Sequence, residues 1–180
     1  MKWYVVSDIH GSSKNLKKVL EYFDQDGDYL VVLGDILYHG PRNNIPESYE
    51  PKVVAKMLNE RKTKVLALRG NCDGEVDQMM LEFPITSDYL IMPFDGYKIF
   101  MTHGHLYDTN ELPWLDLNDA VLFGHIHIPL AEKINGRITL NPGSISIPKM
   151  NNVPSFGVLE NNEFKVLDLD GNVLKSYNIK

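Results

Sequence analysis

Short apolar stretches that end in glycine and polar residues recur along the first half of the chain. Residues 3–11 (WYVVSDIHG) predict a buried strand followed by a turn, and residues 28–35 (DYLVVLGD) and 64–71 (KVLALRGN) repeat the pattern. Nearly continuous apolar runs of this length are typical of strands that are buried on both faces. The pattern therefore predicts three parallel strands, each ending in a polar turn.

Segments with helical spacing lie between these strands. Residues 16–23 (LKKVLEYF) place their apolar side chains on one helical face, and Ser12 or Ser13 precedes them as an N-cap. Residues 53–62 (VVAKMLNERK) and 74–83 (GEVDQMMLEF) predict two further helices. Strands that alternate with helices indicate parallel βαβ units.

The second half of the chain has the pattern of hairpins. Asp95-Gly96 and Asn135-Gly136 separate pairs of apolar strands, and such dipeptides favour tight two-residue turns. Residues 119–125 (DAVLFGH) predict another buried strand, and residues 156–179 a meander that turns at Asp170-Gly171. Together with the first half, this predicts an α/β fold: a layered αββα sandwich of two β-sheets flanked by helices.

Length, composition and charge narrow the class of protein. A chain of 180 residues with 43% hydrophobic residues can bury one substantial core, so we predict a single domain over residues 1–180. The net charge of -6 argues against a general nucleic-acid surface, and no apolar run is long enough to span a membrane. The single cysteine suits a reducing compartment. We therefore expect a cytoplasmic protein with neither a long nucleic acid nor a membrane as its partner.

The ends of the predicted strands carry side chains that bind metals. Five segments, SDIHG, LGDIL, RGNCD, MTHGH and LFGHIHIP, place aspartate, asparagine or histidine just after a strand, and all six histidines lie in or beside them. Ligands of α/β sheets bind at the carboxyl ends of the strands. We therefore predict that one site gathers Asp8, His10, Asp35, Asn71, His103, His125 and His127.

This set of ligands indicates which ions fit. Carboxylate, amide and imidazole together suit Mn²⁺, Fe²⁺ or Zn²⁺ better than Ca²⁺, which prefers oxygen throughout. Seven side chains exceed what one tetrahedral ion accepts, but they fit two ions about 3.5–4 Å apart. Two cations that close need a shared anion, and Asp35 is the natural bridge.

The ordered set DIHG, GD, GNCD, THGH and GHIH, over roughly residues 4–144, resembles the calcineurin-like metallophosphoesterases. The longer strings GDILYHGPRN and RGNCDGEVDQM resemble the YfcE-type phosphodiesterases within that family. The resemblance implies the metallophosphoesterase fold, a tendency to form homo-oligomers, and Mn or Ni as the active metal, with Fe or Zn as alternatives. It also assigns ligands to two metals: Asp8, His10, Asp35 and His127 hold one, and Asp35, Asn71, His103 and His125 the other.

Cys72 stands where the wider family has a histidine, which is thought to stabilise the transition state or to protonate the leaving oxygen. A thiol is a poor source of positive charge, because its charged form is an anion. The alternative is that Cys72 only fills space. The YfcE-type sequences share this cysteine.

Four further polar residues have open roles. Asp73 is expected to accept a hydrogen bond that fixes the loop rather than to bind metal. His39 faces the substrate or supports a ligand, and Arg42 clamps a phosphoryl oxygen or lies on the surface. His105 orients a ligand or caps a loop. Residues 38–49 are the best candidate for the wall of a substrate site.

These observations predict a dimetal-dependent phosphodiesterase that hydrolyses small phosphodiesters by direct attack of a metal-bridging hydroxide. Cys72 favours diesters, because a monoester dianion gains more from an extra cation. Two alternatives remain: a phosphomonoesterase, and a non-catalytic scaffold of this fold that binds a protein partner. All seven predicted ligand positions carry side chains that bind metals, which argues against the scaffold.

Overall fold

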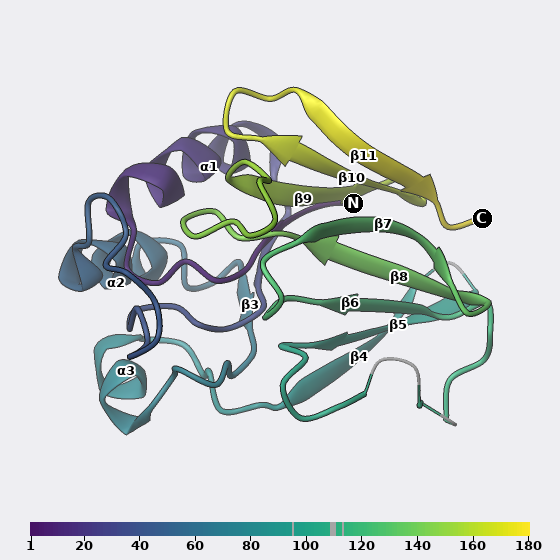
Figure 1. The fold of residues 1–180 in the computed structure, drawn as a ribbon, viewed down its shortest axis with the longest axis horizontal. Helices are drawn as coiled ribbons and strands as arrows, with labels where there is room; N and C mark the ends of the chain where they lie inside the picture. Colours follow the sequence, from purple (N-terminus) through teal and green to yellow (C-terminus); the bar gives the residue numbers. More distant parts are fainter. Residues whose placement is uncertain (95, 109–110, 113) are drawn as a thin grey trace.

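Two β-sheets packed face to face form the body of the protein (Figure 1). The structure is a computed structural model that describes residues 1–94, 96–108, 111–112 and 114–180. Asp95, the first residue of the predicted Asp95-Gly96 turn, lies outside the described residues. No described helix is long and apolar enough to cross a membrane.

The first sheet has six strands in the order β11-β10-β9-β1-β2-β3. Its parallel part consists of the three strands predicted in the first half of the chain, β1 (Lys2–Val6), β2 (Tyr29–Val32) and β3 (Val65–Ala67). The predicted meander supplies its antiparallel part, β9 (Ser155–Glu160), β10 (Glu163–Asp168) and β11 (Val173–Asn178).

The second sheet has five strands in the order β4-β5-β6-β8-β7. These are β4 (Tyr89–Phe94), β5 (Tyr97–Thr102), β6 (Ala120–Phe123), β7 (Pro129–Ile134) and β8 (Arg137–Pro142). The two predicted hairpins, β4-β5 and β7-β8, are antiparallel, whereas β5, β6 and β8 are parallel. Asn135 and Gly136 join β7 to β8 with φ of 50° and 81°, which is the left-handed backbone that a tight hairpin turn requires.

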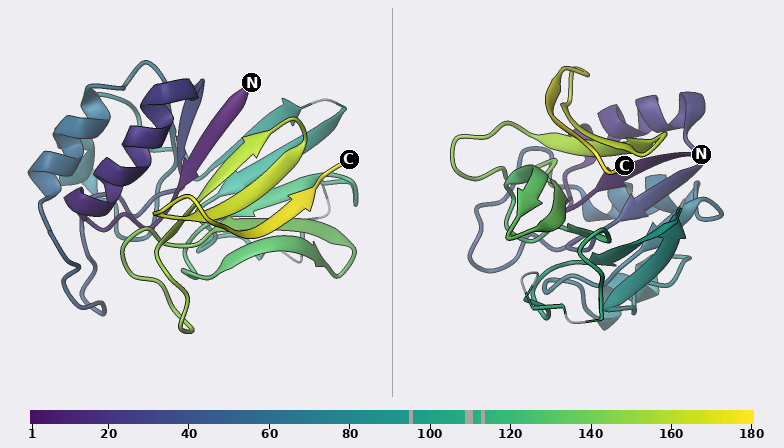
Figure 2. Two further views of the ribbon diagram at one scale, coloured as in Figure 1. Left: turned by 90° about the horizontal axis from the view of Figure 1, so that it is seen from above. Right: turned by 90° about the vertical axis from the view of Figure 1, so that its right-hand side faces the viewer.

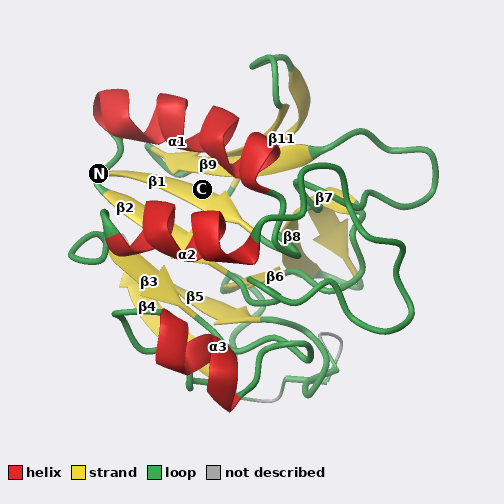
Figure 3. Cartoon of the chain, turned by 90° about the vertical axis from the view of Figure 1, so that its left-hand side faces the viewer, coloured by secondary structure: helices red, strands yellow, loops and turns green. Residues whose placement is uncertain are grey.

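Three helices lie together on one side of the molecule (Figures 2 and 3). They are α1 (Ser13–Asp26), α2 (Pro51–Asn59) and α3 (Glu75–Met80). The helix α1 buries the predicted apolar face, and Ser12 is its N-cap. The helix α2 begins earlier than predicted because Pro51 suits the first turn of a helix.

The two-sheet sandwich is confirmed, but the helical layer differs from the expected one. The described helices cover the first sheet only. On the outer face of the second sheet, Leu112 and Leu115 of the long β5-β6 connection pack against Phe100 and Phe123. Because a few leucines bury this smaller face, no helix is needed there among the described residues.

The main core lies between the two sheets. In β1, Trp3 and Val5 point toward the second sheet, and Tyr4 points toward the helices. Phe164 of β10 is fully buried in the same inter-sheet core, and its ring fills the space where a Cβ on Gly157 would lie. The strand β1 is therefore buried on both faces, as its continuous apolar pattern predicted.

We predict that Phe164→Ala lowers the free energy of unfolding by about 3–5 kcal/mol, because it leaves a cavity between the sheets. Urea unfolding followed by circular dichroism measures this. As a control, Leu174→Ala on β11, where the side chain is 40% exposed, should cost less than about 1 kcal/mol. Equal losses for the two variants would contradict the placement of the core.

Candidate metal centre

Most of the predicted metal ligands occupy a left-handed backbone conformation. The φ angles are 53° at Asp8, 46° at His10, 54° at Asp35, 64° at His125 and 60° at His127. Such conformations are uncommon outside glycine and cost of order 1–3 kcal/mol each unless the surroundings enforce them. The strand ends therefore turn sharply at these residues, and their side chains converge on one place.

Serines hold the turn at Asp8. The Asp8 main-chain carbonyl accepts hydrogen bonds from the hydroxyls of Ser144 (2.8 Å) and Ser146 (2.9 Å). Its side-chain Oδ2 accepts from the Ser7 hydroxyl (2.7 Å) and from the His125 amide (3.0 Å). Only Oδ1 is left without a hydrogen-bond partner, and it is buried.

Asp73 holds the turn at Asp35. Its carboxylate accepts hydrogen bonds from the amides of Asp35 (2.8 Å), Ile36 (2.8 Å) and Gly70 (2.7 Å). Burial raises the pKa of Asp73 to about 6, although these hydrogen bonds favour its ionised form. These hydrogen bonds agree with the expectation that Asp73 fixes the loop, which stays a prediction. Asp73 does not line the pocket that is described below, and it acts by positioning Asp35.

Main-chain carbonyls determine which ring nitrogen carries the proton in three of the histidines. The Nδ1 atoms of these rings lie 2.5–2.8 Å from carbonyl oxygens, in the pairs His10 with Tyr38, His103 with Leu33, and His127 with Ile147. A carbonyl only accepts hydrogen bonds, so Nδ1 must be the donor. In the neutral ring each Nε2 then presents a lone pair, which is the form that binds a metal.

These Nε2 atoms face the two buried carboxylates. The His127 nitrogen is 3.1 Å from Asp8 Oδ1, and the His10 nitrogen is 3.8 Å from Asp8 Oδ1 and 3.7 Å from Asp35 Oδ2. The His103 nitrogen is 3.5 Å from Asp35 Oδ1 and 3.1 Å from Asn71 Oδ1. Asp35 thus lies between the two groups of ligands.

The donor atoms fit divalent cations. Asp8 Oδ1 and His10 Nε2 are buried and have no hydrogen-bond partner among the described residues. Buried polar atoms are normally paired, so an unpaired carboxylate oxygen beside an unpaired imidazole nitrogen suits a cation. Three-residue groups of such atoms lie within 4.8 Å of one another: Asp8, His10 and His127, and also Asp8, Asp35 and His103.

The pKa values of these aspartates and histidines also favour a bound cation. The pKa of Asp8 and of Asp35 is lowered, because their histidine neighbours outweigh burial. Burial lowers the pKa of His10 and His125 and keeps both rings neutral, as metal ligands must be. Burial also opposes charge on His103, but Asp35 and Asp8 raise its pKa to about 9. A bound cation would balance the negative charge of Asp35 in place of the proton on His103.

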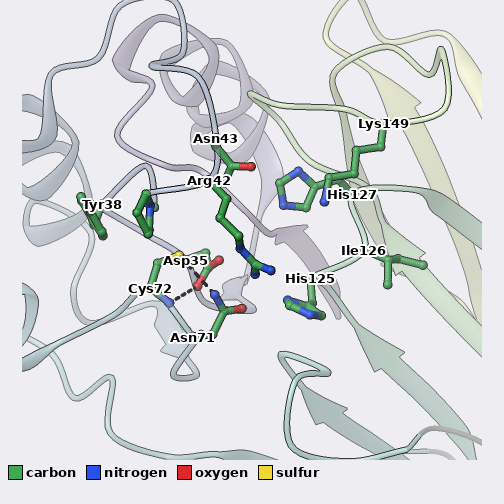
Figure 4. Close-up of a pocket in the computed structure, with 12 residues that line it drawn as sticks. Asp35, Tyr38, Arg42, Asn43, Asn71, Cys72, His125, Ile126, His127 and Lys149 are labelled. Atoms are coloured by element: carbon green, nitrogen blue, oxygen red, sulfur yellow. Dashed lines mark hydrogen bonds between the residues drawn. The ribbon is translucent and has the colours of Figure 1, made fainter.

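The centre opens into a pocket of about 800 Å³ (Figure 4). One wall of it comes from the first part of the predicted segment 38–49, namely Tyr38 and residues 40–43, and the opposite wall includes Ile126, His127 and Lys149. No sequence motif indicated Lys149, whose amide donates a hydrogen bond to the His127 carbonyl (3.2 Å) and so holds the residue at the pocket. Arg42 lines the pocket, and its side chain extends into it.

The remaining candidates lie around this centre. His39 does not line the pocket, and its ring packs between Tyr38 and Tyr49 at centroid distances of 4.8 and 5.2 Å. His105 is stacked edge-on against the ring of His103, at 5.3 Å. Its position beside a ligand agrees with an orienting role, which stays a prediction.

Cys72 lies at the pocket floor beside Asp35. Its amide donates to Asp35 Oδ1 (2.8 Å), and its sulfur accepts a hydrogen bond from Asn71 Nδ2 (3.2 Å). Burial and the neighbouring carboxylates raise the pKa of the thiol to about 12. Cys72 is therefore a neutral thiol at neutral pH.

Paired mixed sheets with aspartates and histidines at their strand ends define the metallophosphoesterase fold. The profile of the calcineurin-like phosphoesterase superfamily domain matches residues 1–163, and the chain belongs to that superfamily. Phosphodiesterase YfcE of Escherichia coli strain K12 is 49% identical over 171 residues, which cover 94% of this chain and 93% of that protein.

Solved structures agree with this assignment. The structure of YfcE, described as a phosphoesterase from E. coli, matches with a TM-score of 0.96 at 47% identity, over the full length of both chains. Vacuolar Protein Sorting 29 from Cryptosporidium parvum has the same fold, with a TM-score of 0.63 at 20% identity over 98% of this chain and 97% of that one. At that identity only the fold is shared.

We predict that Asp73→Asn lowers the free energy of unfolding by about 1–3 kcal/mol, because an amide cannot accept all three backbone hydrogen bonds. It should also weaken Mn²⁺ binding about 10- to 100-fold by releasing Asp35. Urea unfolding and calorimetric titration measure these effects. Asp77→Asn is the control, since Asp77 accepts one amide hydrogen bond at the start of α3. Unchanged Mn²⁺ affinity in Asp73→Asn would contradict the positioning role.

Proposed function

We propose that this protein is a metal-dependent phosphodiesterase that hydrolyses small phosphodiesters. The observation that carries the proposal is the buried pair of unpartnered atoms, Asp8 Oδ1 and His10 Nε2, among imidazoles whose Nε2 lone pairs face them. The similarity to phosphodiesterase YfcE supports the type of reaction.

The chain would hold two divalent cations, with Mn²⁺ as the first candidate and Ni²⁺, Fe²⁺ or Zn²⁺ as alternatives. The ligands of one are Asp8, His10, Asp35 and His127, and those of the other Asp35, Asn71, His103 and His125. When bound, such ions polarise phosphoryl oxygens and lower the pKa of water toward neutrality.

The protein's own residues favour direct attack of water on phosphorus. No serine or threonine lines the pocket among the described residues, and Cys72 is a neutral thiol with a pKa of about 12. Neither group supplies an activated nucleophile, so no covalent enzyme intermediate is needed. The polar side chains around Asp35 instead bind and orient the phosphodiester.

The size and charge of the pocket favour small substrates. About 800 Å³ is the volume of a typical small-molecule site. Arg42 and Lys149 are its only described cationic lining residues, which is less than the basic track that a long nucleic acid needs. We further propose a cytoplasmic location, no membrane partner, and self-association into homo-oligomers; these rest on the sequence and its resemblance.

Two other functions remain as alternatives. A phosphomonoesterase would use the same metals, but Cys72 supplies no cation for a dianion. A protein-binding scaffold of the same fold is the second alternative. The convergence of all seven candidate ligands favours catalysis, because a scaffold has no need to bury unpaired carboxylate oxygens.

The test compares bis(p-nitrophenyl) phosphate with p-nitrophenyl phosphate on chelator-stripped protein, before and after Mn²⁺ is restored. We expect metal-dependent hydrolysis that is faster for the diester. Asp35→Asn should lose at least about 100-fold in kcat and bind less Mn²⁺ by calorimetry, because Asp35 is shared by both ligand groups. Asp170→Asn, an exposed carboxylate on the β10-β11 turn, is the control.

Each other outcome points to a different conclusion. Faster hydrolysis of the monoester would support the phosphomonoesterase. No hydrolysis of either compound with Mn²⁺, Ni²⁺, Zn²⁺ or Fe²⁺ would favour the scaffold. Full activity of Asp35→Asn with two bound metals would show that Asp35 does not bridge them.

We predict that Cys72→His raises the rate of monoester relative to diester hydrolysis by roughly tenfold, the size of one charge-assisted hydrogen bond. Cys72 lines the pocket, so an imidazole there would face the substrate. The two p-nitrophenyl substrates measure the ratio, and Cys72→Ser controls for loss of the thiol. An unchanged ratio in Cys72→His would show that position 72 does not select between the esters.

A further inference from the structure

The loop over Cys72, residues 38–43, packs closely on its thiol. Gly40 has a left-handed φ of 79°, and a Cβ built on it would lie 2.9 Å from the Cys72 sulfur. The loop backbone therefore rests directly on the thiol. The glycine at position 40 allows this close approach.

The same loop is tied to the metal centre. The Tyr38 carbonyl lies 2.8 Å from His10 Nδ1, and the His39 carbonyl accepts a hydrogen bond from Asn43 Nδ2 (2.9 Å). The ring of His39 is held between two tyrosine rings. These contacts fix the backbone on both sides of Arg42, even though its side chain is exposed.

The Arg42 side chain extends from this loop into the pocket, toward the side where Asn71 and His125 lie (Figure 4). Among the described residues, no acidic side chain forms an ion pair with its guanidinium. Asp35, the only carboxylate among the described residues that line the pocket, is 2% exposed and is already engaged by the Cys72 amide and by histidines. Arg42 thus places an unpaired positive charge at the mouth of the metal centre.

We propose that Arg42 is the specificity-determining cation of the site: its guanidinium binds the non-bridging oxygens of the scissile phosphodiester. This inference rests on the proposed function and extends it. Arginine is always charged and presents a planar fork of donors that suits phosphate. It supplies one positive charge to the pocket from the loop that packs on Cys72.

This arrangement restricts the class of substrate. A guanidinium holds its protons at any physiological pH, so it stabilises negative charge but does not protonate the leaving oxygen. Preferred substrates are therefore diesters whose leaving group is a weak base, such as a phenol with an electron-withdrawing substituent. The rate should fall steeply along a series of aryl diesters as the pKa of the leaving phenol rises.

The test uses Mn²⁺-loaded wild-type protein, Arg42→Ala and Arg42→Lys, with bis(p-nitrophenyl) phosphate as substrate. Lys17→Ala is the control, because it removes one positive charge from the exposed side of α1. We expect Arg42→Ala to lose roughly 10- to 100-fold in kcat/KM, which is the size of one hydrogen bond to a charged group. Arg42→Lys should recover part of this, and added guanidinium ion at millimolar concentration should partly rescue Arg42→Ala only.

Binding measurements separate this inference from the proposed function. Calorimetry should show equal Mn²⁺ affinity in wild type and Arg42→Ala, and at least fivefold weaker binding of inorganic phosphate in the variant. If wild type cleaves the diester but Arg42→Ala matches it within twofold, without rescue, the inference is wrong and the function stands. If wild type cleaves no diester, the proposed function is wrong, and equal phosphate binding in the two proteins would overturn the role of Arg42 as well.

Discussion

The main-chain hydrogen bonds that hold the left-handed turns at the strand ends are the constraint on which the site depends. Asp8, Asp35 and His127 adopt a backbone that L-residues avoid, so their surroundings must enforce it. Glycines allow the required close packing: a Cβ on Gly34 would lie 2.4 Å from the Gly70 nitrogen, and one on Gly70 would lie 2.1 Å from Asp35 Oδ1. The backbone strain is thus located at the functional residues. The free energy of packing elsewhere in the two-sheet core offsets it.

The same turns create an electrostatic requirement. Asp8 and Asp35 are buried side by side, and their negative charges need positive partners. Although burial opposes charge on His103, its hydrogen bond to Asp35 and the charges of both carboxylates raise its pKa to about 9. Neutral His10 and the paired carboxylates together make a site for cations rather than a structural ion pair. Stability and metal binding are therefore linked through the same buried oxygens.

The loop over Cys72 distinguishes this centre from the general pattern of its superfamily. A family histidine would bring positive charge from the strand end itself. Here the backbone at Gly40 packs against the thiol. A positive charge in the pocket comes from Arg42, two residues further along the same loop. The loop that carries Arg42 thus packs on Cys72 and forms one wall of the pocket.

The local sequence pattern was sufficient to predict most strands, the hairpins and the candidate metal ligands. Apolar periodicity predicted the strands and hairpins, because alternation and turn dipeptides act within a few residues, and polar strand ends predicted Asp8 and its partners. Tertiary structure decided three features that the local pattern did not show. These are the β5-β6 connection that covers the outer face of the second sheet, the pocket position of Lys149, and the bonds from Ser144 and Ser146 to the Asp8 carbonyl. The serines lie 136 and 138 residues from Asp8, and contacts over that distance arise only when the two sheets pack together.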